Sequence, residues 1–334
     1  MDSRLHKLLW FGVSTAMIAG MIYFADVGKF FQALRTAKLV YLAPAFVAGM
    51  SGFLVWTYVW YSFFRRMQLH IKYTKVLRMF LAGHFLNSIT PLGQFGGEPF
   101  MAYIISRNTE ASYEKAFSTV FSADIVNAVP AFTFILGGAA YLLFLGSVNQ
   151  IVLQTVYLAL LATVVGGTLV YLLWFRAGKI ESGLLRMLQK ISDTVGRGQS
   201  VVERAEESLD RVQESFAMVG EQPGHLMKVA AVAHSSFIVQ IISLYFILLS
   251  VGVTSDFTPL YFVVTLAALA NFAPTPGGSG AFEGAMAGLL TFFIQIDFAS
   301  ALVVAILFRM TTYWPGLLLG YISFNTLEHG ENFR

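Results

Sequence analysis

Residues 91–102 read PLGQFGGEPFMA, and residues 276–287 read PGGSGAFEGAMA. Both segments follow the pattern Pro-x-Gly-x-x-x-x-Glu-x-x-Met-Ala, so the chain carries a short internal repeat. Each copy lies within an apolar segment, 76–105 or 258–296, where proline and glycine interrupt a helix. A single glutamate, Glu98 or Glu283, follows each interruption. The repeat therefore predicts two helical hairpins that each carry one acidic side chain beside the break.

The composition around the repeat is that of a membrane protein. Of 334 residues, 56% are hydrophobic and 12% are charged, whereas a soluble domain has about 25% charged residues. Long apolar stretches can each cross a hydrocarbon layer of about 30 Å as a helix. The predicted full spans are 8–24, 39–63, 116–146, 151–175, 228–251 and 299–325. We expect an all-α polytopic membrane protein in which residues 1–334 form one transmembrane domain.

Several classes of site are disfavoured by the residue types present. The chain has no cysteine, which excludes disulfides, thiolate metal sites and thiol catalysis, and its six histidines show no metal-binding spacing. No P-loop lysine follows the glycines at 277–284, and no Gly-x-Ser-x-Gly signature occurs. We therefore expect no metal, no cofactor, no nucleic-acid partner and no enzymatic activity.

The basic residues predict the orientation in the membrane. Eighteen lysines and arginines fall in loops on one side of the predicted spans, and three fall on the other side, at Lys29, Arg35 and Lys38. Loops rich in lysine and arginine remain in the cytoplasm. We expect a multi-pass protein of the cell membrane with both termini cytoplasmic and with 8–24 retained as the first span.

The same rule decides the path of the two interrupted segments. If 76–105 crossed the membrane once, the strongly basic stretch 176–228 would face outward. We therefore predict that 76–105 enters from the cytoplasm and returns, and that 258–296 enters from the opposite side. Such inverted pairs of broken helices form the substrate sites of many transporters, near the middle of the bilayer.

The candidate site residues are the polar side chains of these segments. Arg309 lies about eleven residues inside the last span, too deep to reach water easily, and needs an acidic partner or an anionic ligand. Its partner in the protein is left open between three carboxylates. The predicted substrate-binding residues are Glu98, Glu283, Arg309, Asp124, Asn87, Asn271 and Tyr313. The predicted hairpin-breaking residues are Pro91, Gly93, Gly96, Gly97, Pro274, Pro276, Gly277, Gly278 and Gly280.

Structural explanations exist for the same residues. The glycines serve tight turns, each glutamate caps the start of a helix, and Arg309 forms a structural salt bridge. The spacing of Gly316 and Gly320 indicates a helix-contact surface. His84 and His234 read as hydrogen-bonded interior histidines, with proton relay as the alternative.

One water-soluble segment separates the fourth and fifth spans. Residues 201–219 place apolar side chains along one helical face and acidic side chains along the other. We predict a cytoplasmic helical hairpin at about 178–224. It packs on itself and on the bundle, or it docks a partner.

With these motifs, the chain resembles the flippase-like transmembrane domain of lysylphosphatidylglycerol synthases, the multiple peptide resistance factor type. The resemblance covers nearly the whole length. It rests on Pro91 to Glu98, on the segment PTPGGSGAFE at 274–283, and on Arg309 with Tyr313, Pro315 and Gly320. In many members an arginine accompanies the acidic residue near Asp124, whereas Ile125 stands here. The sequence lacks the soluble synthase domain, and we expect a stand-alone member.

The resemblance implies two re-entrant hairpins that move aminoacylated phosphatidylglycerol between leaflets, with Glu98, Glu283 and Arg309 in the site; relatives are linked to polyprenyl-phosphate sugars and to hopanoids. Our leading hypothesis is a lipid translocase for an anionic, aminoacylated or polyprenyl-phosphate-linked lipid. The alternatives are a membrane-embedded transferase with Glu98 or Glu283 as general base, and a scaffold for a lipid-modifying synthase. The expected partners are membrane lipids and a lipid-modifying synthase or glycosyltransferase.

Overall fold

The computed structural model describes residues 19–23, 27–89, 97–145, 223–273 and 275–329, and a few positions between 157 and 168. Within these ranges the chain forms ten α-helices and two short 3-10 helices. Most of the predicted spans 8–24 and 151–175, the predicted hairpin at 178–224, and Pro91, Gly93, Gly96 and Pro274 lie outside them. The all-helical class of the prediction is confirmed.

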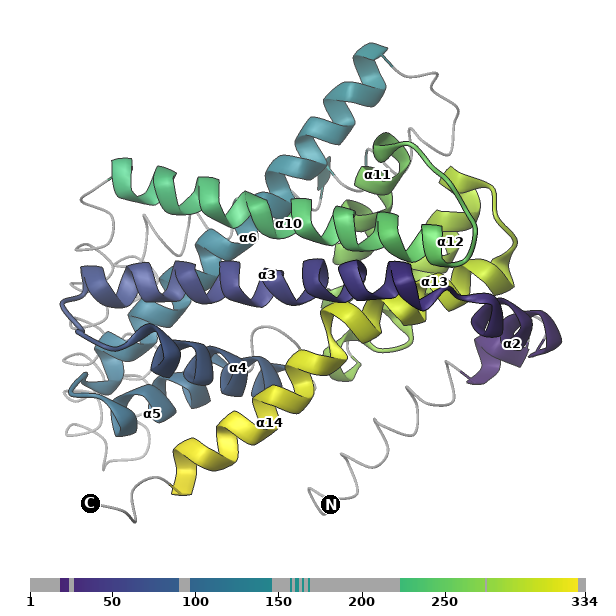
Figure 1. Cartoon of the computed structure of the whole chain (residues 1–334). Coiled ribbons are helices and arrows are strands. Elements are labelled where there is room, and N and C mark those ends of the chain that lie inside the picture. The colour runs from purple at the N-terminus through teal and green to yellow at the C-terminus, as the bar shows by residue number, and fades with distance from the viewer. Residues whose placement is uncertain are drawn as a thin grey trace, which may run out of the picture.

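Four of the described segments are long and apolar enough to cross a membrane: 39–66, 113–141, 224–250 and 298–327. They correspond to four of the six predicted spans. The first, α3 (Leu39–Arg66), and the third, in α10 (Pro223–Ser250), run antiparallel through the centre of the molecule (Figure 1). The second belongs to α6 (Tyr113–Leu145), which crosses both. The chain is a polytopic membrane protein.

Hydrogen bonds at both ends fix the pairing of α3 with α10. The Lys38 backbone N–H donates to the Ser250 carbonyl at 2.8 Å, and Ser62 Oγ lies 3.3 Å from His225 Nε2 near the opposite end. The basic residues of the α3 carboxyl end and of the α10 amino end therefore share one end of the molecule. The short helix α2 (Val27–Thr36), which carries Lys29 and Arg35, lies at the other end (Figure 1).

Two pairs of shorter helices pack within this frame. The first pair is α4 (Tyr73–Ile89) and α5 (Glu98–Asn108), and the second is α11 (Phe257–Ala267) and α12 (Ala281–Ile294). Two 3-10 turns, η2 (Ala268–Phe272) and η3 (Pro276–Gly278), connect the second pair. The first pair lies toward the Arg66 end and the second toward the α2 end (Figure 1). The chain therefore enters and leaves each helix pair at the same end of the molecule.

The final predicted span is present but broken. It consists of α13 (Phe298–Thr312) and α14 (Trp314–His329), with Tyr313 in a non-helical conformation between them. Pro315 has no N–H to donate to the Thr311 carbonyl, which instead packs against Gly49 of α3. The break lies four residues after Arg309, so the Arg309 side chain lies beside an irregular piece of backbone.

Two hydrophobic clusters stabilise the two ends of the molecule. One is formed mainly by α10, α11, α12 and α13, and the other by α3, α4, α5 and α6. Among the described residues, α4 contacts η3, so the two helix pairs meet where these clusters adjoin. The break in the last span lies at the same junction.

Candidate functional site

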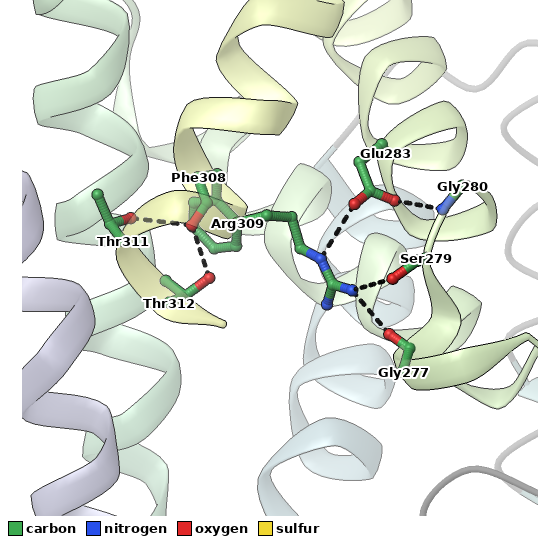
Figure 2. A network of polar contacts seen from close by, with 8 residues as sticks. All are labelled: Gly277, Ser279, Gly280, Glu283, Phe308, Arg309, Thr311 and Thr312. Atoms are coloured by element: carbon green, nitrogen blue, oxygen red, sulfur yellow. Dashed lines mark hydrogen bonds and ion pairs between the residues drawn. The ribbon is translucent and has the colours of Figure 1, made fainter. Parts of the chain in front are cut away.

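The site is built around the buried guanidinium of Arg309. The residue is 4% exposed, and its Nε donates to Oε1 of Glu283 at 3.2 Å (Figure 2). Its Nη2 donates to the Gly277 carbonyl at 2.7 Å and to Ser279 Oγ at 3.2 Å. Of the three candidate acidic partners, the structure pairs Arg309 with Glu283. The ion pair therefore joins α13 to the broken part of the second helix pair.

The backbone of the η3 turn is shaped for this contact. Gly277 has a φ of 57°, in the left-handed region where a side chain is disfavoured, and its carbonyl is thereby turned toward Arg309. A side chain on Gly277 would also collide with the Tyr313 hydroxyl. The glycine is required for the backbone conformation and for the close approach of Tyr313.

Glu283 has two structural roles. It is 1% exposed, and its Oε2 accepts the N–H of Gly280 at 2.7 Å, which caps the amino end of α12. Its Oε1 accepts from Arg309. The cap and the salt bridge that the sequence offered as alternative explanations thus occur together at this residue.

Aromatic rings enclose the guanidinium. The Arg309 carbon Cζ lies 3.5 Å from the Tyr313 ring centroid and 5.0 Å from that of Phe282, both within the range of cation–π attraction. The remaining nitrogen, Nη1, has no hydrogen-bond partner in the part of the chain that the structure describes (Figure 2). The guanidinium thus keeps a donor that the described protein leaves unused.

The first helix pair reaches the same place through α4. The His84 ring packs edge-on against Tyr313, with ring centroids 5.7 Å apart, and against Phe53 at 5.2 Å. His84 Nε2 is buried without a hydrogen-bond partner among the described residues. His234 differs: its two ring nitrogens lie 2.6 Å from the Ala230 carbonyl and 2.7 Å from Thr133 Oγ1. The hydrogen-bonded interpretation is confirmed for His234, whereas Nε2 of His84 forms no such bond within the described residues.

A second polar group contains Glu98 and Asp124. Glu98 begins α5 and is 5% exposed, and α5 packs on α6, the helix that carries Asp124. Trp60 Nε1 donates to Asp124 Oδ1 at 2.8 Å. Within the described ranges neither carboxylate forms a salt bridge. The predicted site residues thus fall into two groups, Glu283 with Arg309 and Tyr313, and Glu98 with Asp124.

The two asparagines lie beside the glycines that follow the breaks. A side chain on Gly97 would collide with Oδ1 of Asn87, and one on Gly278 would press on the backbone of Asn271. Within the described chain, neither asparagine forms a hydrogen bond with Arg309. Both asparagines therefore lie at the interrupted backbone of the two helix pairs.

Sequence reasoning missed three contributors. Ser279 was not singled out, although its place between two of the hairpin glycines was a usable signal. Trp60 is one of many aromatic residues in an apolar helix, which gives no signal for its bond to Asp124. Ser243, which bonds the Ala45 carbonyl at 2.9 Å and lies 3.1 Å from Thr311 Oγ1, ties α10 to α3 and to the end of α13.

Within the described residues, no group of three histidine, aspartate or glutamate side chains is placed to hold a metal ion. The chemistry that the site offers is that of a buried guanidinium with carboxylate, hydroxyl and carbonyl neighbours. Such a set binds and releases anionic oxygen atoms.

Comparison with known proteins places this arrangement in context. The family model described as the lysylphosphatidylglycerol synthase TM region matches residues 9–320. The UPF0104 membrane protein PH1989 of Pyrococcus horikoshii is 23% identical over 324 residues, 95% of each chain. A UPF0104 membrane protein of Methanothermobacter thermautotrophicus is 25% identical over 311 residues, 90% of each chain. The similarity therefore extends over both helix pairs and Arg309.

Proposed function

From the premise that the chain belongs to the lysylphosphatidylglycerol synthase transmembrane region family, we propose that it is a lipid translocase. Its substrate is an anionic or aminoacylated phospholipid, or a polyprenyl-phosphate-linked lipid, which it moves between the leaflets. The headgroup passes through the polar region at the centre of the molecule, and the acyl chains stay in the bilayer. We propose no nucleotide-driven step, so the net direction follows a lipid or ion gradient.

The proposal treats the two helix pairs as re-entrant hairpins. The pair α4–α5 enters from the cytoplasmic side, and the pair α11–α12 enters from the opposite side, between about six full spans. Each helix of these pairs has at most 17 residues, which is about 26 Å and less than a full crossing. The contact between α4 and η3 supports a meeting point at mid-depth.

The observation that carries the proposal is the buried guanidinium of Arg309. A cation inside a membrane is costly, by about 3 kcal/mol on insertion scales, and usually marks a functional position. Here it faces irregular backbone, at the junction of both helix pairs, and keeps Nη1 unused among the described residues. A purely structural salt bridge needs neither the broken helix nor the free donor.

The proposed switch is an exchange of partners on Arg309. In the resting protein, the Glu283 carboxylate balances its charge. The phosphate of an arriving headgroup binds first at Nη1, and then competes with Glu283 for the rest of the guanidinium. Release of the carboxylate loosens the contact between α13 and the η3 turn, and the headgroup passes toward the other leaflet.

The direct test is lipid exchange in liposomes that contain the purified protein. Vesicles carry fluorescent headgroup-labelled phosphatidylglycerol, lysylphosphatidylglycerol or a polyprenyl-phosphate lipid, and an impermeant quencher reads the outer leaflet. We expect a quenchable fraction that rises beyond the outer-leaflet share when protein is present. Exchange no faster than in protein-free vesicles, for all three lipids and with folded protein, would overturn the proposal.

The transferase alternative has its own readout in the same preparation. Formation of a modified lipid from lipid and an activated donor, without exchange between leaflets, would favour it. Arg309→Ala is the informative variant for the translocase, because it removes the guanidinium and leaves the Glu283 cap of α12 in place. We expect it to abolish transport of anionic lipids, and Arg309→Lys to rescue transport poorly, since an ammonium lacks the planar fork.

A further inference from the structure

A cavity of about 410 Å³ lies apart from Arg309, between α4, α5 and α14. Its size falls within the roughly 300–1,000 Å³ typical of small-molecule sites. Its walls are apolar and come from all three helices: Leu86, Phe100, Ile104, Phe324 and Leu327. Phe100 is 56% exposed, so the cavity opens on a surface that the surrounding hydrocarbon would contact.

The polar part of the cavity is at the carboxyl end of α5. Arg107 and Asn108 line it there, together with Tyr103. The Arg107 Nε donates to the Tyr103 hydroxyl at 3.2 Å, and the guanidinium carbon lies 5.5 Å from the Tyr103 ring centroid. The tyrosine thus holds the exposed Arg107 side chain beside the cavity that both residues line.

A second cation borders the same end. Lys75 Nζ donates to the Asn108 carbonyl, which places the ammonium at the last turn of α5. The basic residues at the end of α3 gather at this end of the molecule (Figure 1). Arg107 and Lys75 thus place two cationic side chains at this end of the cavity.

We infer that this cavity binds an anionic glycerophospholipid from the leaflet on the basic, predicted cytoplasmic side. The phosphate lies at Arg107 and Lys75, and one acyl chain lies against the apolar walls between α5 and α14. The order of the walls, apolar toward the interior and cationic at the end, matches the order of groups in a phospholipid. In addition, the bilayer around the protein keeps phospholipids in contact with the opening of the cavity.

The inference deepens the proposed function and rests on it, because it identifies where the translocated lipid is first captured. A lipid held with its phosphate at α5 lies beside the first helix pair. Sliding along α5 would carry the headgroup from Arg107 toward Glu98, which begins the same helix. The helix α5 has eleven residues and is therefore about 17 Å long.

The test measures lipid binding without transport. Purified protein is equilibrated with equal amounts of phosphatidylglycerol and phosphatidylcholine, and native mass spectrometry counts the lipids retained. We expect the wild type to retain phosphatidylglycerol preferentially. Arg107→Gln should reduce this preference about tenfold, and Arg65→Gln, which removes an exposed cation from the same end but outside the cavity, should leave it unchanged.

A second variant tests the apolar walls. Ile104→Trp fills the cavity and keeps every cation, so it should reduce retention of both lipids. Soluble glycerol phosphate should not compete, because it lacks the acyl chain. Wild-type lipid preference in Arg107→Gln together with wild-type lipid retention in Ile104→Trp, with each variant shown to be folded by its thermal unfolding, would overturn the inference.

The two proposals fail in different ways. If the wild type shows no lipid exchange in liposomes but Arg107→Gln loses the binding preference, the lipid site stands and the translocase does not. If exchange is normal while both cavity variants bind lipid as the wild type does, the translocase stands and this capture site does not.

Discussion

The pair of Arg309 and Glu283 allows stability and transport to be separated. Arg309→Met removes the guanidinium and leaves the Glu283 carboxylate 1% exposed without its cation. Breaking a buried ion pair by removing one partner costs about 3–5 kcal/mol. The variant also loses the hydrogen bonds to the Gly277 carbonyl and to Ser279 Oγ. We expect the free energy of unfolding to fall by an amount in this range.

A second substitution should restore most of that loss. Glu283→Gln removes the uncompensated charge and keeps an oxygen that can accept the Gly280 N–H, so the amino end of α12 stays capped. Replacing both members of a buried ion pair by neutral residues is often close to neutral for stability. The double variant Arg309→Met with Glu283→Gln should therefore unfold much like the wild type.

The assay is denaturant unfolding in detergent micelles, followed by tryptophan fluorescence, because Trp314 lies next to the site. Arg65→Met is the matched control, since this arginine is exposed and a change there should stay within about 0.5 kcal/mol. A loss below about 1 kcal/mol in Arg309→Met, as for a surface salt bridge, would refute the energetic argument. Full transport by the stable double variant would refute the headgroup role of Arg309.

Three further predictions concern packing, capping and orientation. Gly320→Leu should destabilise the protein, because Leu81 and Phe85 of α4 occupy the space that a side chain would need. Thermal unfolding measures the loss of stability. The control Leu318→Ala, at an exposed position of the same helix, should show little change. The Ser300 hydrogen bonds hold the pKa of Asp297 below its ordinary value. The cap of α13 is therefore fully stabilising above about pH 4, and its contribution is lost at lower pH as the carboxyl protonates. Asp297→Ala should lower the free energy of unfolding by about 1 kcal/mol at pH 7 and remove the part of the stability that depends on acid. A single cysteine at Ser147 or Ser255 should react with an impermeant thiol reagent outside intact cells and one at Ser192 should not, and outside labelling at Ser192 would reverse the orientation that the basic residues predict.

The sequence predicted the parts of the fold that depend on the length of apolar segments and on local backbone chemistry. Apolar segments of more than 18 residues gave the positions of the long helices, because the thickness of a bilayer sets that length. The repeated Pro-x-Gly pattern identified the interrupted segments, because proline and glycine act locally on the backbone. The break at Tyr313 was not predicted, although Pro315 was visible, because proline often only bends a membrane helix.

Within the site, the residue types were predictable and their pairing was not. Arg309 required an anion on grounds of cost alone, but three carboxylates were equally available in the sequence. The choice of Glu283 follows from the tertiary packing of α12 on α13, which no local pattern encodes. Ser279 and the Gly277 carbonyl complete the binding of the guanidinium, and the carbonyl depends on a left-handed backbone that only the folded turn reveals.

The break in the last span links the two helix pairs. On one side of it, α13 packs on α12 and carries Arg309 to the η3 turn. On the other side, α14 packs along α4, where Gly316 adjoins His84 and Gly320 adjoins the Leu81 carbonyl; Gly316 also adjoins Phe53 of α3. Gly316 and Gly320 thus serve a contact within the chain.

Tyr313 stands between these two halves and touches both Arg309 and His84. A continuous helix would move as one rod, and each displacement at Arg309 would be imposed directly on α14. The break instead separates the packing of α13 on the second helix pair from the packing of α14 on the first. An exchange of the partner of Arg309, as we propose, would therefore act on Tyr313, whose ring contacts Arg309 on the side of the second pair and His84 of α4 on the side of the first.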